Sequence, residues 1–175
     1  MPDTFTLIAS STVGSGGAAS IDFTSIPSTY TDLKIVVSAR SSYSSSEGVL
    51  MQFNGSSGAN YFYRQLYGFG SSSPGSYTPG SGQTSCLVGT MGGTNFTAST
   101  FDSVEIYIPN YTSSNNKSFS VDSVAENNSA TSNQLDLIAG LWSQTAAITS
   151  ISFTSYNSAN FVQYSTFYLY GIKNS

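Results

Sequence analysis

The chain has 175 residues and a net charge of −4, and only 8% of its residues are charged. Five lysines and arginines are too few to neutralise a run of phosphates, so we expect no nucleic-acid partner. No apolar segment approaches the ~18 residues of a membrane span, and the first residues lack the pattern of a leader. We therefore expect no membrane partner and synthesis in the cytoplasm.

Serine and threonine supply the polar surface that charged residues do not, with 36 Ser and 18 Thr in the chain. Aromatic residues make up 14% of the sequence, which is more than a disordered chain would carry and predicts a packed domain. A single cysteine, Cys86, excludes an intramolecular disulfide and suits a reducing compartment.

Short windows of alternating apolar and polar residues follow one another along the chain, as in strands with one buried face. The clearest window is 32–40, and the window 49–55 ends in Asn54-Gly55, a strong turn signal that predicts a hairpin with 61–68. The other windows are 4–10, 19–26, 86–90, 101–110, 118–126, 134–142, 147–154 and 165–173.

The segment 69–100 is rich in glycine, serine and proline and predicts a long loop region with one short strand at Cys86–Thr90. The remaining windows give about nine or ten short strands and no helix. We therefore predict an all-β fold: an antiparallel β-sandwich of jelly-roll or Greek-key type, formed as one domain over residues 1–175.

The last window is unusually aromatic for the end of a chain. From Phe167 to Ile172 its residues alternate, with Phe167, Leu169 and Gly171 on one side. Loose termini gain too little burial to offset the entropy of ordering. The segment is therefore predicted to be a strand of a sheet that the fold cannot lose.

Catalytic chemistry has little support, because the chain has no histidine to act as a base or zinc ligand. The closest acidic pairs are Asp102 with Glu105, which face opposite sides of a strand, and Asp122 with Glu126; all four are predicted on a solvated sheet surface. Cys86 is expected to be a small buried residue. We predict no catalytic, metal or cofactor site, and no enzyme activity.

A cluster of tyrosine and arginine is the best candidate for a contact with another protein, because both residue types are enriched at interfaces. In 61–68 three tyrosines share one side of the strand and Arg64 lies on the other, although an ordinary aromatic sheet face explains the pattern as well. Trp142 could fill the core, a subunit interface or a sugar-stacking position. The candidate interface residues are Arg40, Tyr61, Tyr63, Arg64, Tyr67 and Trp142.

The chain resembles virion structural proteins of tailed bacteriophages, especially those of marine and cyanobacterial hosts. The resemblance lies in three blocks that together cover more than half of the sequence: SIPSTYTDLKIVVSARSS, LMQFNGSSGANYFYRQLYG, and LIAGLWSQTAAITSISFT leading to FVQYSTFYLYGIKNS. Proteins of this kind occur as stand-alone chains and as distal modules of fibres.

The resemblance implies a jelly-roll-like module, usually a homotrimer, on the outer surface of the virion. Because the first strand is predicted from about residue 4, with no shaft before it, a capsid decoration or cement protein is favoured, with the major capsid protein and copies of itself as partners. The alternative is a receptor-binding fibre or tail module whose loops at 69–100 and 155–163 contact a glycan or protein of the host surface.

Overall fold

The computed structural model describes residues 4–128 and 133–173. In these ranges the protein contains strands and no helix, and so none that could span a membrane. The strands are β1 (Phe5–Thr12), β2 (Ser20–Phe23), β3 (Asp32–Ala39), β4 (Glu47–Phe53), β5 (Tyr61–Phe69), β6 (Gly75–Tyr77), β7 (Cys86–Met91), β8 (Asp102–Ile108), β9 (Lys117–Glu126), β10 (Asn133–Trp142), β11 (Ile151–Ser155) and β12 (Thr166–Ile172).

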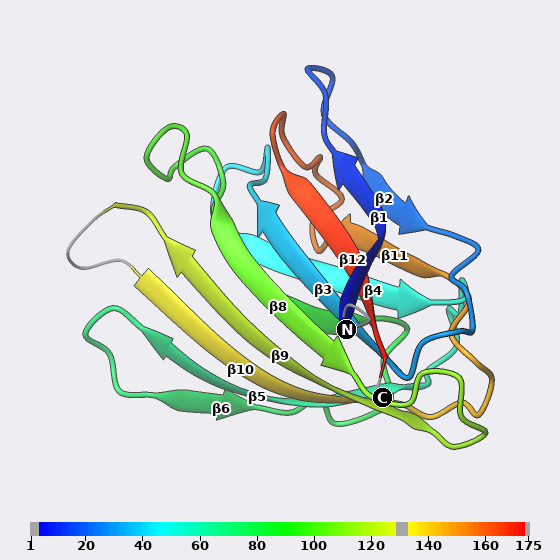
Figure 1. Ribbon diagram of the computed structural model, residues 1–175. Helices are drawn as coiled ribbons and strands as arrows, with labels where there is room; N and C mark the ends of the chain where they lie inside the picture. The colour runs from blue at the N-terminus through cyan, green and yellow to red at the C-terminus, as the bar shows by residue number, and fades with distance from the viewer. Residues whose placement is uncertain (1–3, 129–132, 174–175) are drawn as a thin grey trace.

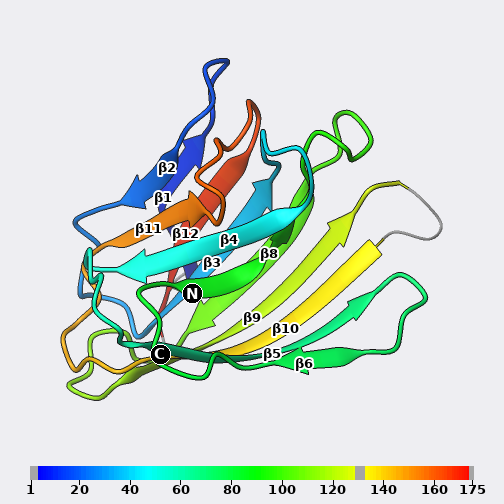
Figure 2. The same ribbon diagram turned by 180° about the vertical axis from the view of Figure 1, so that it is seen from behind.

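Two antiparallel sheets pack face to face, which confirms the predicted β-sandwich (Figures 1 and 2). The larger sheet has the order β1-β12-β3-β8-β9-β10-β5-β6, and the smaller has the order β2-β11-β4-β7. From β1 to β4, and again through β7, β8, β11 and β12, the chain alternates between the two sheets, as is typical of jelly rolls.

Four strands lie outside this alternation and lengthen the larger sheet on one side. These strands, β9, β10, β5 and β6, are called the extension below, and Figure 2 shows them reaching beyond the smaller sheet. Of the smaller sheet, β7 contacts β9, β10 and β5, so it covers part of the inner face of the extension. The rest of that inner face has no sheet above it.

The core forms where the apolar faces of the two sheets meet, because successive side chains of a strand point to opposite faces. In β9, residues with odd numbers are buried and those with even numbers are exposed over all ten positions. Phe153 and Phe167 pack across the sandwich with ring centroids 5.3 Å apart. The alternation read from the sequence therefore sorts core from surface correctly here.

The aromatic segment at 166–172 forms β12, an internal strand that pairs with β1 on one side and β3 on the other. Phe167 and Leu169 are fully buried, as the sequence predicts. This strand joins the first and third strands of the chain, so its loss would divide the larger sheet.

The predicted hairpin between 49–53 and 61–68 is wrong, because β4 lies in the smaller sheet and β5 in the larger. Asn54 and Gly55 do form a turn with positive φ angles of 53° and 62°. The Asn54 side chain accepts hydrogen bonds from the amides of Thr149 and Ser150 at 2.8 and 3.0 Å, and its amide donates to Ala147. These long-range bonds hold the turn against the segment that leads into β11, the neighbour of β4 in the smaller sheet, and the chain then crosses to β5 instead of pairing back.

Candidate functional site

Two of the six candidate interface residues lie in the core. Tyr61 and Trp142 are cross-strand neighbours of β5 and β10, and their rings stack with centroids 6.4 Å apart. Trp142 also packs against Phe53, and the Phe53 amide donates to the Tyr61 hydroxyl at 2.7 Å. Both aromatic side chains are almost fully buried, so they support the sandwich and are not available to a sugar or a partner in this structure.

Arg40 is also buried, with 9% of its surface exposed. Its guanidinium donates to the backbone oxygens of Phe96, Thr97 and Thr100 at 3.0, 2.6 and 3.2 Å. A single arginine thus satisfies three carbonyl groups of a loop that has no sheet partner of its own. Arg40 therefore acts as a tie: it follows directly after β3 and holds the segment 96–100 against the end of that strand.

The other three candidates lie on the extension, on the two faces that the sequence assigns to them. Tyr63 and Tyr67 project from the inner face of β5, and Arg64 projects from the outer face, where it is exposed. Burial raises the pKa of Tyr63 to about 12, with smaller contributions from Cys86, Tyr77 and Tyr156. The Tyr63 hydroxyl therefore keeps its proton and is a hydrogen-bond donor throughout the neutral range.

The acidic residues do not form a catalytic pair of the kind considered from the sequence. Asp102 is buried, contrary to the expected solvated position, and accepts hydrogen bonds from the amides of Gly92 and, at 2.8 Å, Glu126. Burial raises its pKa above the ordinary value, against the effect of these two bonds. Asp122 and Glu126 lie on the exposed face of β9, as predicted.

Sequence reasoning missed one acidic pair, Glu105 and Asp122, which are direct cross-strand neighbours on β8 and β9. Lys34 forms an ion pair with Glu105 at 2.7 Å, so one of the two like charges is balanced. The signal that could have found the pair is the register between two strands, which neither strand carries alone. The pair lies on the open outer face, where water screens both carboxylates.

Cys86 is fully buried, as expected, and burial raises the pKa of its thiol. It therefore lacks the thiolate character that a nucleophile or metal ligand needs. Among the described residues, no three His, Cys, Asp or Glu side chains gather as a metal site would require.

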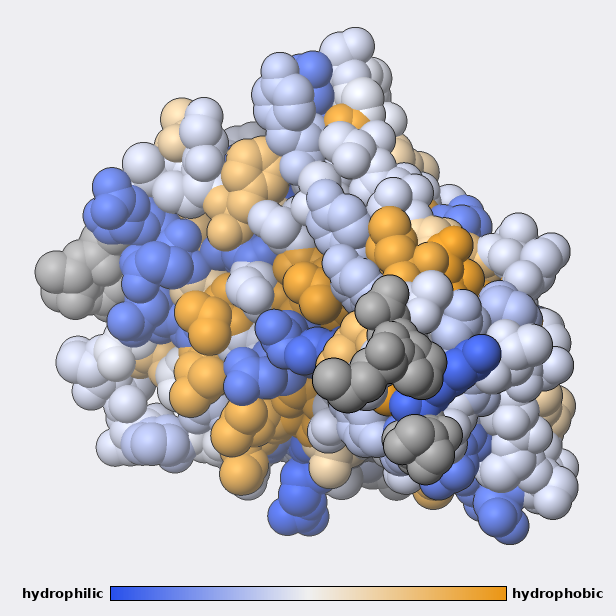
Figure 3. Space-filling model, in the orientation of Figure 1, coloured by the Kyte–Doolittle hydropathy of each residue, from blue (hydrophilic) through white to orange (hydrophobic). Residues whose placement is uncertain are grey.

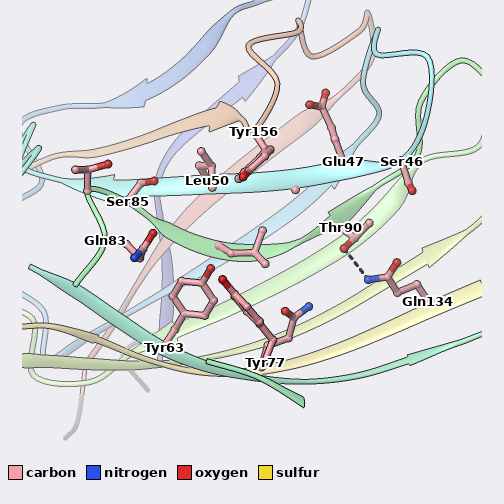
Figure 4. Close-up of a pocket in the computed structure, with 14 residues that line it drawn as sticks. Ser46, Glu47, Leu50, Tyr63, Tyr77, Gln83, Ser85, Thr90, Gln134 and Tyr156 are labelled. Carbon is pink, nitrogen blue, oxygen red and sulfur yellow. Dashed lines mark hydrogen bonds between the residues drawn. The ribbon is translucent and has the colours of Figure 1, made fainter. Parts of the chain in front are cut away.

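A cleft of about 620 Å³ opens where β7 and β4 of the smaller sheet stop covering the inner face of the extension. Figure 4 shows Tyr63 and Tyr77 pointing into it from the extension, with Leu50 and Tyr156 on the opposite side. Its volume lies within the range of pockets that bind small ligands. Tyr77 comes from the 69–100 segment and Tyr156 from the 155–163 loop, so the cleft brings together both loops singled out in the sequence.

A hydrogen-bonded network forms the floor of the cleft. The buried Asp136 carboxylate accepts bonds from Gln65 Nε2 at 2.8 Å and Gln134 Nε2 at 3.0 Å. Gln134 also donates to the Thr90 hydroxyl at 2.9 Å (Figure 4). Because a carboxylate is only an acceptor, both amide nitrogens must face it, which fixes the orientation of both glutamine side chains.

The opposite, outer face of the extension carries an apolar surface that we call the outer patch, formed by Leu66, Val124, Leu135 and Leu137. Leu137 is the cross-strand neighbour of Leu66, and Leu135 that of Val124, so the four side chains are contiguous. Each is between 42% and 54% exposed. Figure 3 shows apolar side chains gathering over β5, β9 and β10 in the view of Figure 1.

No protein-family model, no curated protein and no solved structure matches this chain. The cleft and the outer patch are therefore the two features on which a function can be argued.

Proposed function

We propose that this chain is a non-enzymatic structural protein of a tailed-phage virion, which binds the outside of the head as a capsid decoration or cement protein. The outer patch is the observation that carries the proposal. Contiguous exposed apolar surface marks a site of protein interaction, and here it lies on neighbouring strands of a regular sheet. The three sequence blocks that resemble virion proteins support the same conclusion.

The outer patch suits a rigid protein lattice as its partner. Its four side chains come from three neighbouring strands, so their positions are fixed before contact, and docking does not require a loop to become ordered. Arg64 and Asp122 lie on the same outer face beside the patch and supply charges of both signs. Such a charged rim sets the orientation of docking while the apolar centre provides most of the affinity.

Binding to the mature shell stabilises the shell by mass action. A ligand that binds only the assembled lattice contributes RT ln(1 + [L]/Kd) at each site, and a homotrimer that touches several capsid subunits raises the effective concentration of each contact. The surface of this domain suits the role. Only 8% of the residues are charged, so few of its interactions would weaken when salt screens charges. The partners in this proposal are the major capsid protein and two further copies of the chain.

The decisive experiment is cryo-electron microscopy of the intact phage particle that contains this polypeptide. We expect density for the β-sandwich in an icosahedral array on the head, with the outer patch turned to the shell. Density confined to the tail would replace the proposal with the second candidate. Absence of the polypeptide from purified particles would reject a virion role altogether.

The second candidate is a receptor-binding module of a fibre or tail. The cleft favours it, because two loops from distant parts of the sequence meet there with exposed tyrosines. In that reading the tail would present the cleft to a glycan or protein on the host surface.

A further inference from the structure

We propose that the cleft between β4, β7 and the extension is a binding site for a neutral carbohydrate. This inference concerns the ligand of the isolated domain, and it stands whether the protein occupies the head or the tail. It is carried by the tyrosines, the amide groups and the charges that line the cleft.

The tyrosines provide surfaces on which a sugar ring can stack. Tyr77 is 51% exposed and Tyr156 is 68% exposed, and the rings of Tyr63 and Tyr77 lie with centroids 6.3 Å apart at an angle of 52°. A sugar presents an apolar C–H face and a rim of hydroxyl groups, and a tyrosine matches both with an apolar ring and a polar tip. Three such rings from β5, β6 and the loop after β11 surround one volume.

The polar groups of the cleft suit hydroxyl ligands. With their nitrogens turned to Asp136, Gln65 and Gln134 direct their carbonyl oxygens away from that carboxylate. The Thr90 hydroxyl accepts from Gln134, so its own proton is left to donate. Sugar hydroxyls are donors and acceptors at once, and this mixture of fixed donors and acceptors is complementary to them.

The charges of the cleft select against an anionic sugar. None of the five basic residues, Lys34, Arg40, Arg64, Lys117 and Lys173, lines it. Two carboxylates lie at the cleft: Asp136 beneath its floor, and Glu47 in its wall, which accepts from the Ser41 hydroxyl and from the Asn157 amide at 2.9 Å. A uronate, sulfate or sialate would lose its hydration without meeting a cation, and that loss is costly.

The cleft is held in shape before any ligand arrives. The Tyr156 amide donates to the Gly48 carbonyl at 2.9 Å, and the Asn157 amide donates to the Glu47 carboxylate. The loop that carries Tyr156 is therefore bonded to β4 at two points. On the other side, Tyr77 is the cross-strand neighbour of Gln65, whose side chain Asp136 fixes. Because these side chains and loops are already ordered, ligand binding would lose less conformational entropy.

The test uses the purified full chain and a panel of neutral hexasaccharides of glucose, mannose, galactose and N-acetylglucosamine, with a galacturonate hexasaccharide as the anionic comparison. Isothermal titration calorimetry gives the affinity, and saturation-transfer NMR identifies the sugar protons that touch the protein. We expect at least one neutral sugar to bind, with an affinity that changes little when salt is raised, because no ion pair is involved.

Two variants locate the binding. Tyr77→Ala and Tyr156→Ala remove exposed rings from the cleft, and each should weaken binding at least tenfold. Tyr164→Ala removes an equally exposed ring that does not line the cleft and should bind as the wild type does. Circular dichroism of each variant verifies that the fold is kept.

Three outcomes would overturn the proposal: no neutral sugar binds at millimolar concentration, the galacturonate binds more tightly than every neutral sugar, or both cleft variants retain wild-type affinity. None of these results bears on whether the protein decorates the head, which the position of its density on the particle decides separately.

Discussion

Gln65 and Leu66 are successive residues of β5 that serve opposite faces of the same strand. The Gln65 side chain is buried and bonded to Asp136 at the floor of the cleft, whereas Leu66 is 54% exposed on the outer patch. Docking of the outer patch on a shell would therefore leave the cleft turned away from that shell and open to the surroundings. The two proposed surfaces do not compete, and one protein could use both at once.

Leu137→Asp should abolish attachment to the head without unfolding the domain. The substitution places a charge at the centre of the outer patch, next to Leu66, where docking would have to remove it from water. The free energy of unfolding should fall by no more than about 1–2 kcal/mol, because the side chain is 45% exposed and the new carboxylate lies across from Asp122. Binding to particles that lack the protein, measured by co-sedimentation, tests the first statement and urea unfolding the second. Tyr164→Asp is the matched control, and wild-type attachment by Leu137→Asp would remove the outer patch from the proposal.

Arg40→Met should destabilise the protein by about 2–4 kcal/mol, because three carbonyl groups of the segment 96–100 lose their shared donor. Protease cleavage within that segment should become faster in the variant. Arg64→Met, on the exposed face of β5, should stay within about 0.5 kcal/mol of the wild type. Urea unfolding of both variants makes the comparison, and equal losses would contradict the assignment of Arg40 as a tie.

Asp102→Asn should remove a pH dependence of stability. Burial raises the pKa of Asp102 in the folded state above its ordinary value of 3.8, so the native protein holds the proton more tightly than the unfolded chain. The contribution of this residue to stability is therefore complete below about pH 3.8 and is lost as the pH rises through the folded pKa.

Urea unfolding of wild type and Asp102→Asn across the acid range isolates this effect from the other carboxylates. The stability of the wild type relative to the variant should fall as the pH rises through that window and then stay level. A relative stability that rises with pH would mean that the two backbone amides outweigh burial at this carboxylate.

Gly140→Ala should cost about 1–3 kcal/mol, because a methyl group at this position of β10 would overlap the ring of Phe119 in the core. Gly68→Ala is a matched control on the neighbouring strand, where an added methyl group meets no atom within 4 Å. Thermal unfolding should separate the two variants by several degrees. Equal melting temperatures would show that the core adjusts around residue 140 without cost.

The sandwich could be predicted because its strands carry their burial pattern locally. Leu33 and Ile35 of β3, and Phe167 and Leu169 of β12, alternate with exposed positions in the sequence, and this property does not depend on the partner strand. Pairing is different, since the Asn54-Gly55 turn specifies a reversal but not the sheet that the next strand joins. The turn is held by bonds to residues more than 90 positions away, beside β11, and β5 finds its partner β10 far along the chain as well, so neither contact can be read from the turn itself.

The cleft could be predicted only in part. The sides of β5 on which Tyr63, Arg64 and Tyr67 lie follow from its alternation. The closeness of Tyr77 and Tyr156 does not, because Tyr77 lies on β6, a strand of three residues that is too short to show a period, and Tyr156 lies in a loop. The hydrogen bonds from Arg40 to the segment 96–100 could not be predicted either, because that segment is a loop with no repeating pattern. A sequence reports which residues share a face of one strand and leaves open which strands and loops meet.

The position of β12 between β1 and β3 has a consequence during protein synthesis. Until residues 166–172 leave the ribosome, β1 and β3 both present unpaired backbone groups at the gap where β12 belongs. Exposed strand edges are templates for association between nascent chains, and contacts so distant in sequence form slowly. We therefore expect the speed with which β12 enters this gap, more than the stability of the finished sandwich, to limit the yield of folded protein.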